Sequence, residues 1–228
     1  MNTKVNIAGI EFKNPVMTAS GTFGSGMEYS EFVDLSALGA VVTKGVANVP
    51  WPGNPTPRVA EVYGGMLNAI GLQNPGIDVF IERDIPFLKQ YDTKIIVNVC
   101  GKTIKEYLEV VERLADTDVD MLEINVSCPN VKEGAIAFGQ KADCLSEITS
   151  AIKKVAKQPI IMKLSPNVTD ITEMAMAAEA AGGSRCHFSD QHPDRHENRH
   201  QPPHLRPCQQ NRRHVRPGYQ TCSRPYGL

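Results

Sequence analysis

The sequence predicts an α/β fold in which a parallel sheet is built from repeated strand–helix units. Two observations in residues 1–183 favour this class: short apolar runs alternate with segments of helical periodicity, and polar residues stand where several of the runs end. A third observation concerns the architecture. The glycine-rich dinucleotide fingerprint is missing after the first strand, so we favour a (β/α)8 TIM barrel over a doubly wound sheet. About five of the eight units of such a barrel are visible.

The expected strands are short, rich in β-branched residues and in several cases bounded by glycine, proline or polar clusters. These features are typical of strands buried on both faces of a parallel sheet. In chain order the strands are Pro15–Ser20, Ala40–Gly45, Lys94–Cys100, Met121–Val126 and Pro159–Ser165.

Helices are expected between and after the later strands. In Thr103–Ala115 and Lys141–Ala156, apolar residues recur at the spacing that places them on one helical face. Asp170–Ala181 begins with an acidic residue and is followed by Gly182, a residue typical of helix C-caps. Strands that alternate with such helices form the units of the predicted barrel.

Composition divides the chain after residue 183. The whole chain has 228 residues, is 41% hydrophobic and carries a net charge of −1, which suits one large domain or two small ones. Residues 184–228 hold all 6 histidines but no lysine, alanine, isoleucine or methionine. The net charge is −6 in residues 1–183 and +5 in the tail. We therefore expect residues 1–183 to be the amino-terminal part of the barrel, and 184–228 to be an aberrant, disordered tail.

Several broad classes of protein are disfavoured by the same composition. Residues 1–21 lack the pattern of a secretory signal, and no apolar run approaches the ~18 residues of a membrane span. A near-neutral chain is a poor candidate for nucleic-acid binding. We expect a cytoplasmic protein with reduced thiols and no metal site.

Polar residues at the carboxyl ends of the strands are the first candidates for a site, because functional groups collect there in α/β proteins. Lys44 and Lys163 would form a cationic floor for an anionic ligand, and Asn98 and Asn125 would supply amide donors and acceptors. The alternatives are that the lysines are edge residues whose charge reaches water, and that the asparagines only satisfy structural hydrogen bonds.

Cys128 is the candidate for a reactive group. It lies just past the fourth predicted strand in the sequence NVSCPN, where polar neighbours and a loop position favour a thiol able to accept a proton. The alternative is a small buried hydrophobic residue. Cys100 and Cys144 lack such a setting, and we interpret both as structural.

Two loops are candidates for ligand contacts. Residues 68–76 (NAIGLQNPG) form a loop by their glycine, proline and asparagine content; such a loop is either an ordinary turn or a binding segment. The Ser20–Gly21 pair after the first strand allows the backbone to approach a ligand closely.

Several of these segments together resemble the dihydroorotate dehydrogenases. The similarity spans residues 1–183 and is carried by NPVMTASGTF (14–23), TKG (43–45), NPTPRVAE (54–61), MLNAIGLQNPG (66–76), EINVSCPNV (123–131) and MKLSPNVTD (162–170). In having a cysteine within NVSCPN, the chain resembles the class 1 enzymes of this family. NPTPRVAE and CPNVKEG are most similar to the NAD-dependent class 1B catalytic subunits.

The resemblance implies an FMN-dependent oxidation of dihydroorotate to orotate in the synthesis of UMP. It makes Cys128 the base that removes the C5 proton, while FMN receives the C6 hydride. It implies substrate contacts from Lys44, Asn68, Ala69, Ile70, Gly71, Leu72, Asn125 and Asn130. It implies FMN contacts from Ser20, Gly21, Lys44, Gly45, Asn98, Asn125 and Lys163.

The resemblance also implies partners. Electrons would pass to NAD through an iron–sulfur flavoprotein subunit that carries FAD and a 2Fe–2S cluster, and the catalytic subunit would form a homodimer. The alternatives are a fumarate-dependent class 1A enzyme and, in another class, a non-catalytic fragment that lacks the FMN phosphate site. A third is a relative of the dihydropyrimidine dehydrogenases.

The tail departs from the resemblance. Its histidines and arginines would fit a metal-binding or nucleic-acid arm, but prolines interrupt the histidine spacing and no CxxC pair is present. A shift of reading frame explains more. With synonymous codons chosen freely, reading from one nucleotide later at Asp190 gives INTLTGMKID, which resembles the family's continuation. We therefore expect residues 184–228 to be an out-of-frame reading, and this chain to bind FMN weakly.

Overall fold

The computed structural model describes residues 2–63, 65–127, 138–165, 168–182 and 220–222. The chain divides into two compact units. The first comprises residues 1–51 and 74–190, and the second comprises residues 52–73 and 191–228.

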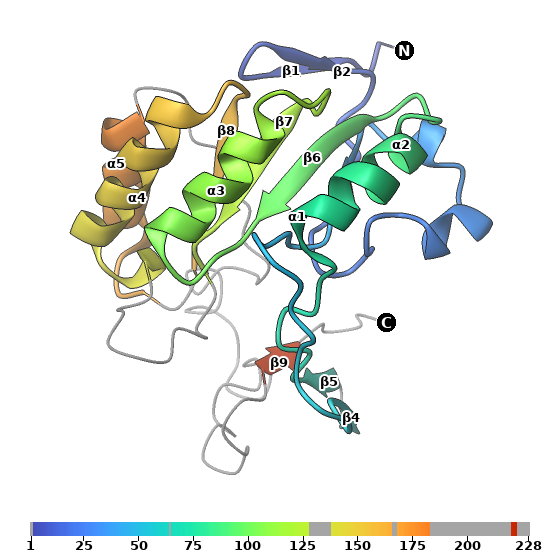
Figure 1. Ribbon diagram of the computed structural model, residues 1–228, viewed down its shortest axis with the longest axis horizontal. Coiled ribbons are helices and arrows are strands. Elements are labelled where there is room, and N and C mark those ends of the chain that lie inside the picture. The colour runs from blue at the N-terminus through green and yellow to red at the C-terminus, as the bar shows by residue number, and fades with distance from the viewer. Residues whose placement is uncertain (1, 64, 128–137, 166–167, 183–219, 223–228) are drawn as a thin grey trace. The chain divides into compact units, whose positions relative to one another are not determined.

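The first unit is built on a parallel sheet of four strands (Figure 1). The strands are β3 (Ala40–Val42), β6 (Lys94–Val99), β7 (Met121–Asn125) and β8 (Ile160–Lys163). Each strand pairs with the next one along the chain, so the order β3-β6-β7-β8 does not reverse. A doubly wound sheet reverses its strand order at a switch point, whereas a barrel adds strands in sequence. The order agrees with the predicted barrel architecture.

Alternate residues of these strands face two different surroundings, as the period of two requires. Val41, Ile95, Val97 and Leu122 belong to the larger core cluster, which includes residues of the helices. Ala40, Val42, Ile96, Met121 and Ile161 belong to a second cluster around Phe12. This second cluster forms the inner face of the sheet. On that face, the residues that follow the cluster toward the carboxyl ends of β6, β7 and β8 are polar.

The predicted helices are present on the outer side of the sheet (Figure 1). They are α3 (Ile104–Leu114), α4 (Ala142–Val155) and α5 (Ile171–Gly182). Thr103 caps α3 by accepting a hydrogen bond from the Glu106 amide, and Asp170 accepts one from the Thr172 amide at 2.8 Å. Gly182, which we expected to follow the last helix, is its final described residue.

One helical segment was not predicted. It runs through α1 (Gly76–Val79), a π-helical turn (η3, Phe80–Asp84) and α2 (Ile85–Leu88). Pro86 near the start of α2 has no N–H group to bond the carbonyl four residues earlier. The widened turn and the proline explain why the 3.6-residue pattern is weak here. Short 3-10 turns lie at Glu28–Glu31 (η1), Leu35–Ala37 (η2) and Phe138–Gln140 (η4).

The amino-terminal segment corrects the predicted first strand. Pro15–Ser20 forms only a single bridge, between Met17 and Ala40, because the Thr18 hydroxyl accepts a hydrogen bond from the Val42 amide at 2.8 Å in place of a backbone carbonyl. An unpredicted hairpin of β1 (Val5–Ile7) and β2 (Ile10–Phe12) precedes it. Its apolar side chains pack on the inner cluster at the end where the strands begin.

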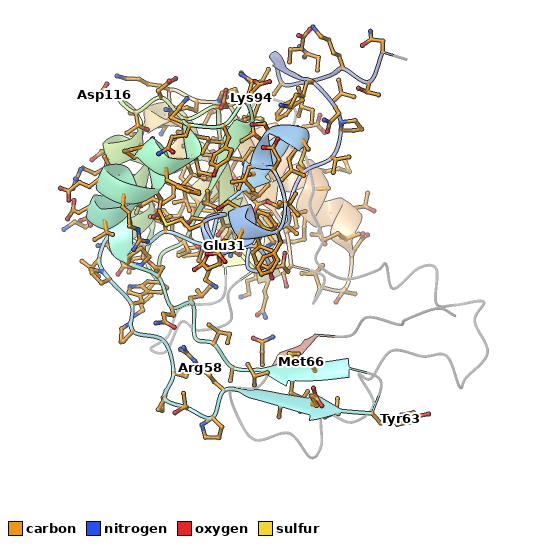
Figure 2. The ribbon with its side chains drawn as sticks, turned by 90° about the vertical axis from the view of Figure 1, so that its right-hand side faces the viewer. Glu31, Arg58, Tyr63, Met66, Lys94 and Asp116 are labelled. Atoms are coloured by element: carbon orange, nitrogen blue, oxygen red, sulfur yellow. The ribbon has the colours of Figure 1, made fainter. Side chains whose placement is uncertain are left out.

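The second unit holds an antiparallel sheet of β4 (Val59–Val62), β5 (Gly65–Asn68) and β9 (Gln220–Cys222). Figure 2 shows the hairpin of β4 and β5, with Tyr63 at its turn and Met66 on β5. The strand β9 is the one described part of the predicted tail, and the rest of 184–228 lies outside the described residues. Among the described helices, none is long and apolar enough to span a membrane.

Tyr107 ties helix α3 to the carboxyl end of β7. Its buried hydroxyl donates a hydrogen bond of 2.6 Å to the Asn125 backbone carbonyl. We expect Tyr107→Phe to lower the free energy of unfolding by about 1 kcal/mol, the usual contribution of such a bond. Urea denaturation measures this change, and Tyr91→Phe is the control on a half-buried tyrosine. Equal losses in the two variants would contradict the assignment.

Candidate functional site

A buried polar cluster stands at the carboxyl ends of the central strands, directly above the apolar inner layer. Asn98 follows Ile96 by two residues on β6, Glu123 follows Met121 on β7, and Lys163 follows Ile161 on β8. The period of two therefore turns these side chains to the inner face. The cluster consists of Ser20, Asn98, Glu123, Asn125 and Lys163, all of them buried.

The Ser20 hydroxyl is the centre of the cluster. It donates its single proton to Glu123 Oε1 at 2.7 Å and accepts hydrogen bonds from Lys163 Nζ at 2.7 Å and Asn98 Nδ2 at 3.3 Å. A hydroxyl has one proton to give and two lone pairs to receive protons. These three bonds thus use its one donor and both of its acceptor positions. Protons are donated from Lys163 and Asn98 to Ser20, and from Ser20 to Glu123.

Lys163 and Glu123 form a buried ion pair beside this serine. Lys163 Nζ lies 4.0 Å from Glu123 Oε1, and the two side chains are 4% and 5% exposed. Asn98 Nδ2 also donates to Glu123 Oε1. Charges removed from water need such partners, because an unpaired charge at this depth would cost several kcal/mol.

Asn125 extends the cluster toward the loop after β7. Its Nδ2 donates to Asn98 Oδ1 at 3.4 Å, and its Oδ1 accepts from the Ser127 hydroxyl at 2.7 Å. The amide therefore connects the cluster to the first residues of the segment in which Cys128 is found. Cys128 and Asn130 themselves lie outside the described residues, so their predicted roles stay predictions.

The strand β3 changes register just before the site. Val42, the last residue of β3, pairs with Ile96, and Val46 beyond it bridges to Val99, so the chain after β3 has one more residue than β6 between these pairs. This bulge falls on Thr43, Lys44 and Gly45. Extra residues of this kind re-aim side chains next to functional sites. The half-buried Lys44 is therefore placed by the bulge and not by simple strand alternation.

Two predicted glycines are required by the backbone or its neighbours. A Cβ atom at Gly45 would stand 2.9 Å from Asn98 Oδ1, closer than real Cβ atoms come, and in a tight contact of 3.3 Å with Cys100 Sγ. Gly21 has φ of +84°, in the left-handed region that favours glycine. Cys100 is fully buried, in keeping with a structural residue.

The predicted substrate loop, Asn68–Leu72, lies in the second unit and is held there by Asn54. The backbone N–H of Asn54 donates a hydrogen bond of 3.1 Å to Ile70 O. The side-chain Nδ2 of Asn54 donates one of 2.9 Å to Ala69 O. Leu72 has φ of +53°, which is unusual for a branched side chain. Such strain persists only where surrounding contacts enforce it, and it is concentrated at functional sites.

Glu123 is the member of the cluster that the sequence interpretation did not assign. The alternation in Met121–Asn125 places Glu123 on the same face as Asn125, so the strand period alone would have found it. Among the described residues, no group of three or more histidine, cysteine, aspartate or glutamate side chains is arranged to hold a metal ion.

The fold and the cluster define a class: an α/β-barrel protein with charged and amide side chains at the carboxyl ends of its strands. Comparison with known proteins identifies the family within this class. The family model for dihydroorotate dehydrogenase matches residues 2–188. The chain belongs to the dihydroorotate dehydrogenase family.

The relatives are similar over most of this chain. The catalytic subunit of dihydroorotate dehydrogenase B (NAD(+)) from Lachnoclostridium phytofermentans is 74% identical over 182 residues, covering 80% of this chain and 61% of the relative. The corresponding subunit from Alkaliphilus metalliredigens is 68% identical over 182 residues, with 80% and 60% covered. The chain thus spans about three fifths of the length of these relatives.

A solved structure supports the fold. The dihydroorotate dehydrogenase of Eimeria tenella, determined with ferulenol, superposes with a TM-score of 0.63 at 23% identity. The match covers 79% of this chain and 57% of that one. At this identity the similarity supports the fold alone, and it confirms the predicted barrel class.

The close contact at Gly45 yields a test of the site's packing. We expect Gly45→Ala to lower the free energy of unfolding by about 1–3 kcal/mol, because the added methyl group would overlap Asn98. The loss should shrink in an Asn98→Ala background, which removes the nearest atom. Urea denaturation of the four chains measures both effects. Equal losses in the two backgrounds would show that Asn98 does not confine Gly45.

Proposed function

We propose that this protein is the catalytic subunit of an NAD-linked dihydroorotate dehydrogenase, which oxidises dihydroorotate to orotate in pyrimidine synthesis in the cytoplasm. The observation that carries the proposal is the buried cluster of Ser20, Asn98, Glu123, Asn125 and Lys163 at the carboxyl ends of the strands. It stands in a chain that is 74% identical to a subunit of that name.

The cluster fits the chemistry of FMN. A flavin ring is rich in hydrogen-bond acceptors and carries negative charge when reduced, and the site holds an ammonium group on Lys163 and amide groups on Asn98 and Asn125. The residues that would hold FMN are Ser20, Gly21, Lys44, Gly45, Asn98, Asn125 and Lys163. FMN, when bound, supplies the acceptor for the hydride that leaves C6 of dihydroorotate.

The chain's own residues have separate tasks in this reaction. Cys128 would remove the proton from C5 of the substrate. The half-buried Lys44 balances the substrate carboxylate. The other proposed substrate contacts are Asn68, Ala69, Ile70, Gly71, Leu72, Asn125 and Asn130. A thiol has an ordinary pKa near ~8.5, so a cysteine is a usable base near neutral pH.

The electron acceptor and the assembly belong to the same proposal. The relatives' names include NAD(+) and describe a catalytic subunit. We infer a partner subunit that carries FAD and a 2Fe–2S cluster, and a homodimer of the catalytic subunit. Direct reduction of fumarate is the alternative. Purification together with an iron–sulfur flavoprotein supports the first arrangement, and turnover by the lone subunit with fumarate supports the second.

We also propose that residues 1–183 form the barrel portion and that 184–228 are read out of frame. The support is the change of composition after residue 183, the displaced reading from Asp190, and relatives whose similarity spans 182 residues. The family model itself extends to residue 188. Resequencing the source DNA tests this directly: we expect a displaced reading that continues as a barrel. Codons confirmed in the present frame, with no such continuation, would refute it.

The enzymatic proposal is tested by flavin absorbance and orotate formation. Both are measured on the 228-residue chain and on a variant in which one nucleotide is removed ahead of codon 190. We expect weak FMN binding and little turnover from the first, and stoichiometric FMN with dihydroorotate oxidation from the second. Full activity of the first chain would contradict the assignment of the tail. No FMN and no activity in either chain would contradict the proposed function.

The base is tested by Cys128→Ser in the active variant. We expect the rate of orotate formation to fall by about 100-fold or more, since general bases contribute at least this much. FMN content should stay unchanged. Cys144→Ser, on the half-buried face of α4, is the matched control and should keep full activity. A Cys128→Ser chain with an unchanged rate would exclude this cysteine as the base.

A further inference from the structure

Glu123 is the one side chain of the buried cluster for which the proposed reaction supplies no direct task. We propose that Glu123 is a positioning residue, which acts through the Ser20 hydroxyl to fix the place of the Lys163 ammonium group. The inference rests on the proposed function only for the proposed contact between Lys163 and FMN. The positioning itself is a property of this chain.

The first step of the argument is the burial of the two charges. Glu123 and Lys163 come from neighbouring strands, and both side chains are buried. At 4.0 Å, their separation is too long for a direct hydrogen bond. A glutamate used only as a direct partner would lie closer. The separation therefore indicates that the attraction acts together with a bridging group.

The bridging group is the Ser20 hydroxyl. Lys163 Nζ and Glu123 Oε1 each lie 2.7 Å from Ser20 Oγ, on its acceptor and donor sides. A carboxylate can only accept, so Glu123 sets the direction of the serine proton. With that proton turned to Glu123, a lone pair of Ser20 faces Lys163. The carboxylate thus orients the serine, and the serine orients the lysine.

Glu123 also orients the side-chain amide of Asn98, through a second hydrogen bond. Asn98 Nδ2 donates to both Glu123 Oε1 and Ser20 Oγ, which leaves Asn98 Oδ1 directed at Asn125 Nδ2 at 3.4 Å. Asn98, Asn125 and Lys163 are among the side chains proposed to hold the cofactor. A change at Glu123 would therefore disturb several cofactor contacts without removing any of the contacting side chains.

The first experiment requires no cofactor. The 228-residue chain and its variants are labelled with acetic anhydride, and the rate at each lysine is measured by mass spectrometry. A buried amine reacts through local opening, so its rate follows the open population. We expect about a tenfold faster reaction at Lys163 in Glu123→Gln, equivalent to about 1.4 kcal/mol of lost local stability. The rate at Lys94, paired with Asp120 elsewhere on the sheet, should stay constant.

Two further variants make the result specific. Ser20→Ala removes the bridge and should accelerate Lys163 to a similar degree, and adding Glu123→Gln to it should change little. Asp84→Asn is the matched control, since Asp84 is a buried carboxylate whose hydrogen bond to Arg83 Nε, at 2.6 Å, raises the pKa of Arg83. Asp84→Asn should lower the urea midpoint but leave the Lys163 rate unchanged.

The outcomes separate the inference from its alternatives. Acceleration in Glu123→Gln and Ser20→Ala alone supports the positioning role. No acceleration in either variant overturns it, and so does equal acceleration in Asp84→Asn, which would indicate general loosening of the fold. Independent effects of Ser20→Ala and Glu123→Gln would overturn the route through serine.

The cofactor is then tested separately. The dissociation constant for FMN is measured by fluorescence quenching on the same chains. We expect about a tenfold increase in Glu123→Gln, or about 1.4 kcal/mol, and none in Asp84→Asn. If neither the unaltered chain nor the variant with one nucleotide removed ahead of codon 190 binds FMN, the proposed function fails, while the labelling rates still decide the role of Glu123.

Discussion

The structure depends on one constraint: polar side chains on the inner face of a buried parallel sheet must satisfy one another. The sheet places an apolar layer, with Ile96, Met121 and Ile161, below a layer that contains Asn98, Glu123 and Lys163. Both layers are buried, so the ammonium, carboxylate, hydroxyl and amide groups take their partners from one another. The register of strand pairing therefore sets the geometry of the site, because a slip of one residue would turn the charged side chain of the shifted strand toward the core formed with the helices.

The constraint also explains how burial and chemistry coexist in this site. Hydrogen bonds in a water-poor interior are stronger than in solution, and a cluster whose members are all paired is rigid. Rigid donors need little rearrangement when negative charge develops near them, which is the condition for electrostatic stabilisation in an enzyme. Tyr107 connects this rigidity to the outer helices, because its hydroxyl bonds the backbone at the end of β7.

The sequence predicted the elements whose patterns are strictly local. The strands around Ile96, Leu122 and Met162 and the helix capped by Thr103 were found from apolar runs, spacing and caps. The first strand was overestimated, since whether Thr18 bonds through its side chain or its backbone depends on β3, far along the chain. The helix around Phe80 was missed because a π turn and Pro86 disturb its period. Glu123 lies on the same strand face as Asn125 and could have been found from the strand period, but its contacts with Ser20 and Lys163 join segments far apart in the sequence.

The extra residue between the end of β3 and Val46 shapes the edge of the site. Thr43, Lys44 and Gly45 span the place where the pairing with β6 shifts by one residue. Loss of a single residue there would remove the bulge and leave Val46 opposite Val99 in regular register, but it would take away the irregular backbone on which Lys44 and Gly45 stand. The number of residues in this short stretch therefore sets the backbone path that brings Lys44 and Gly45 beside β6.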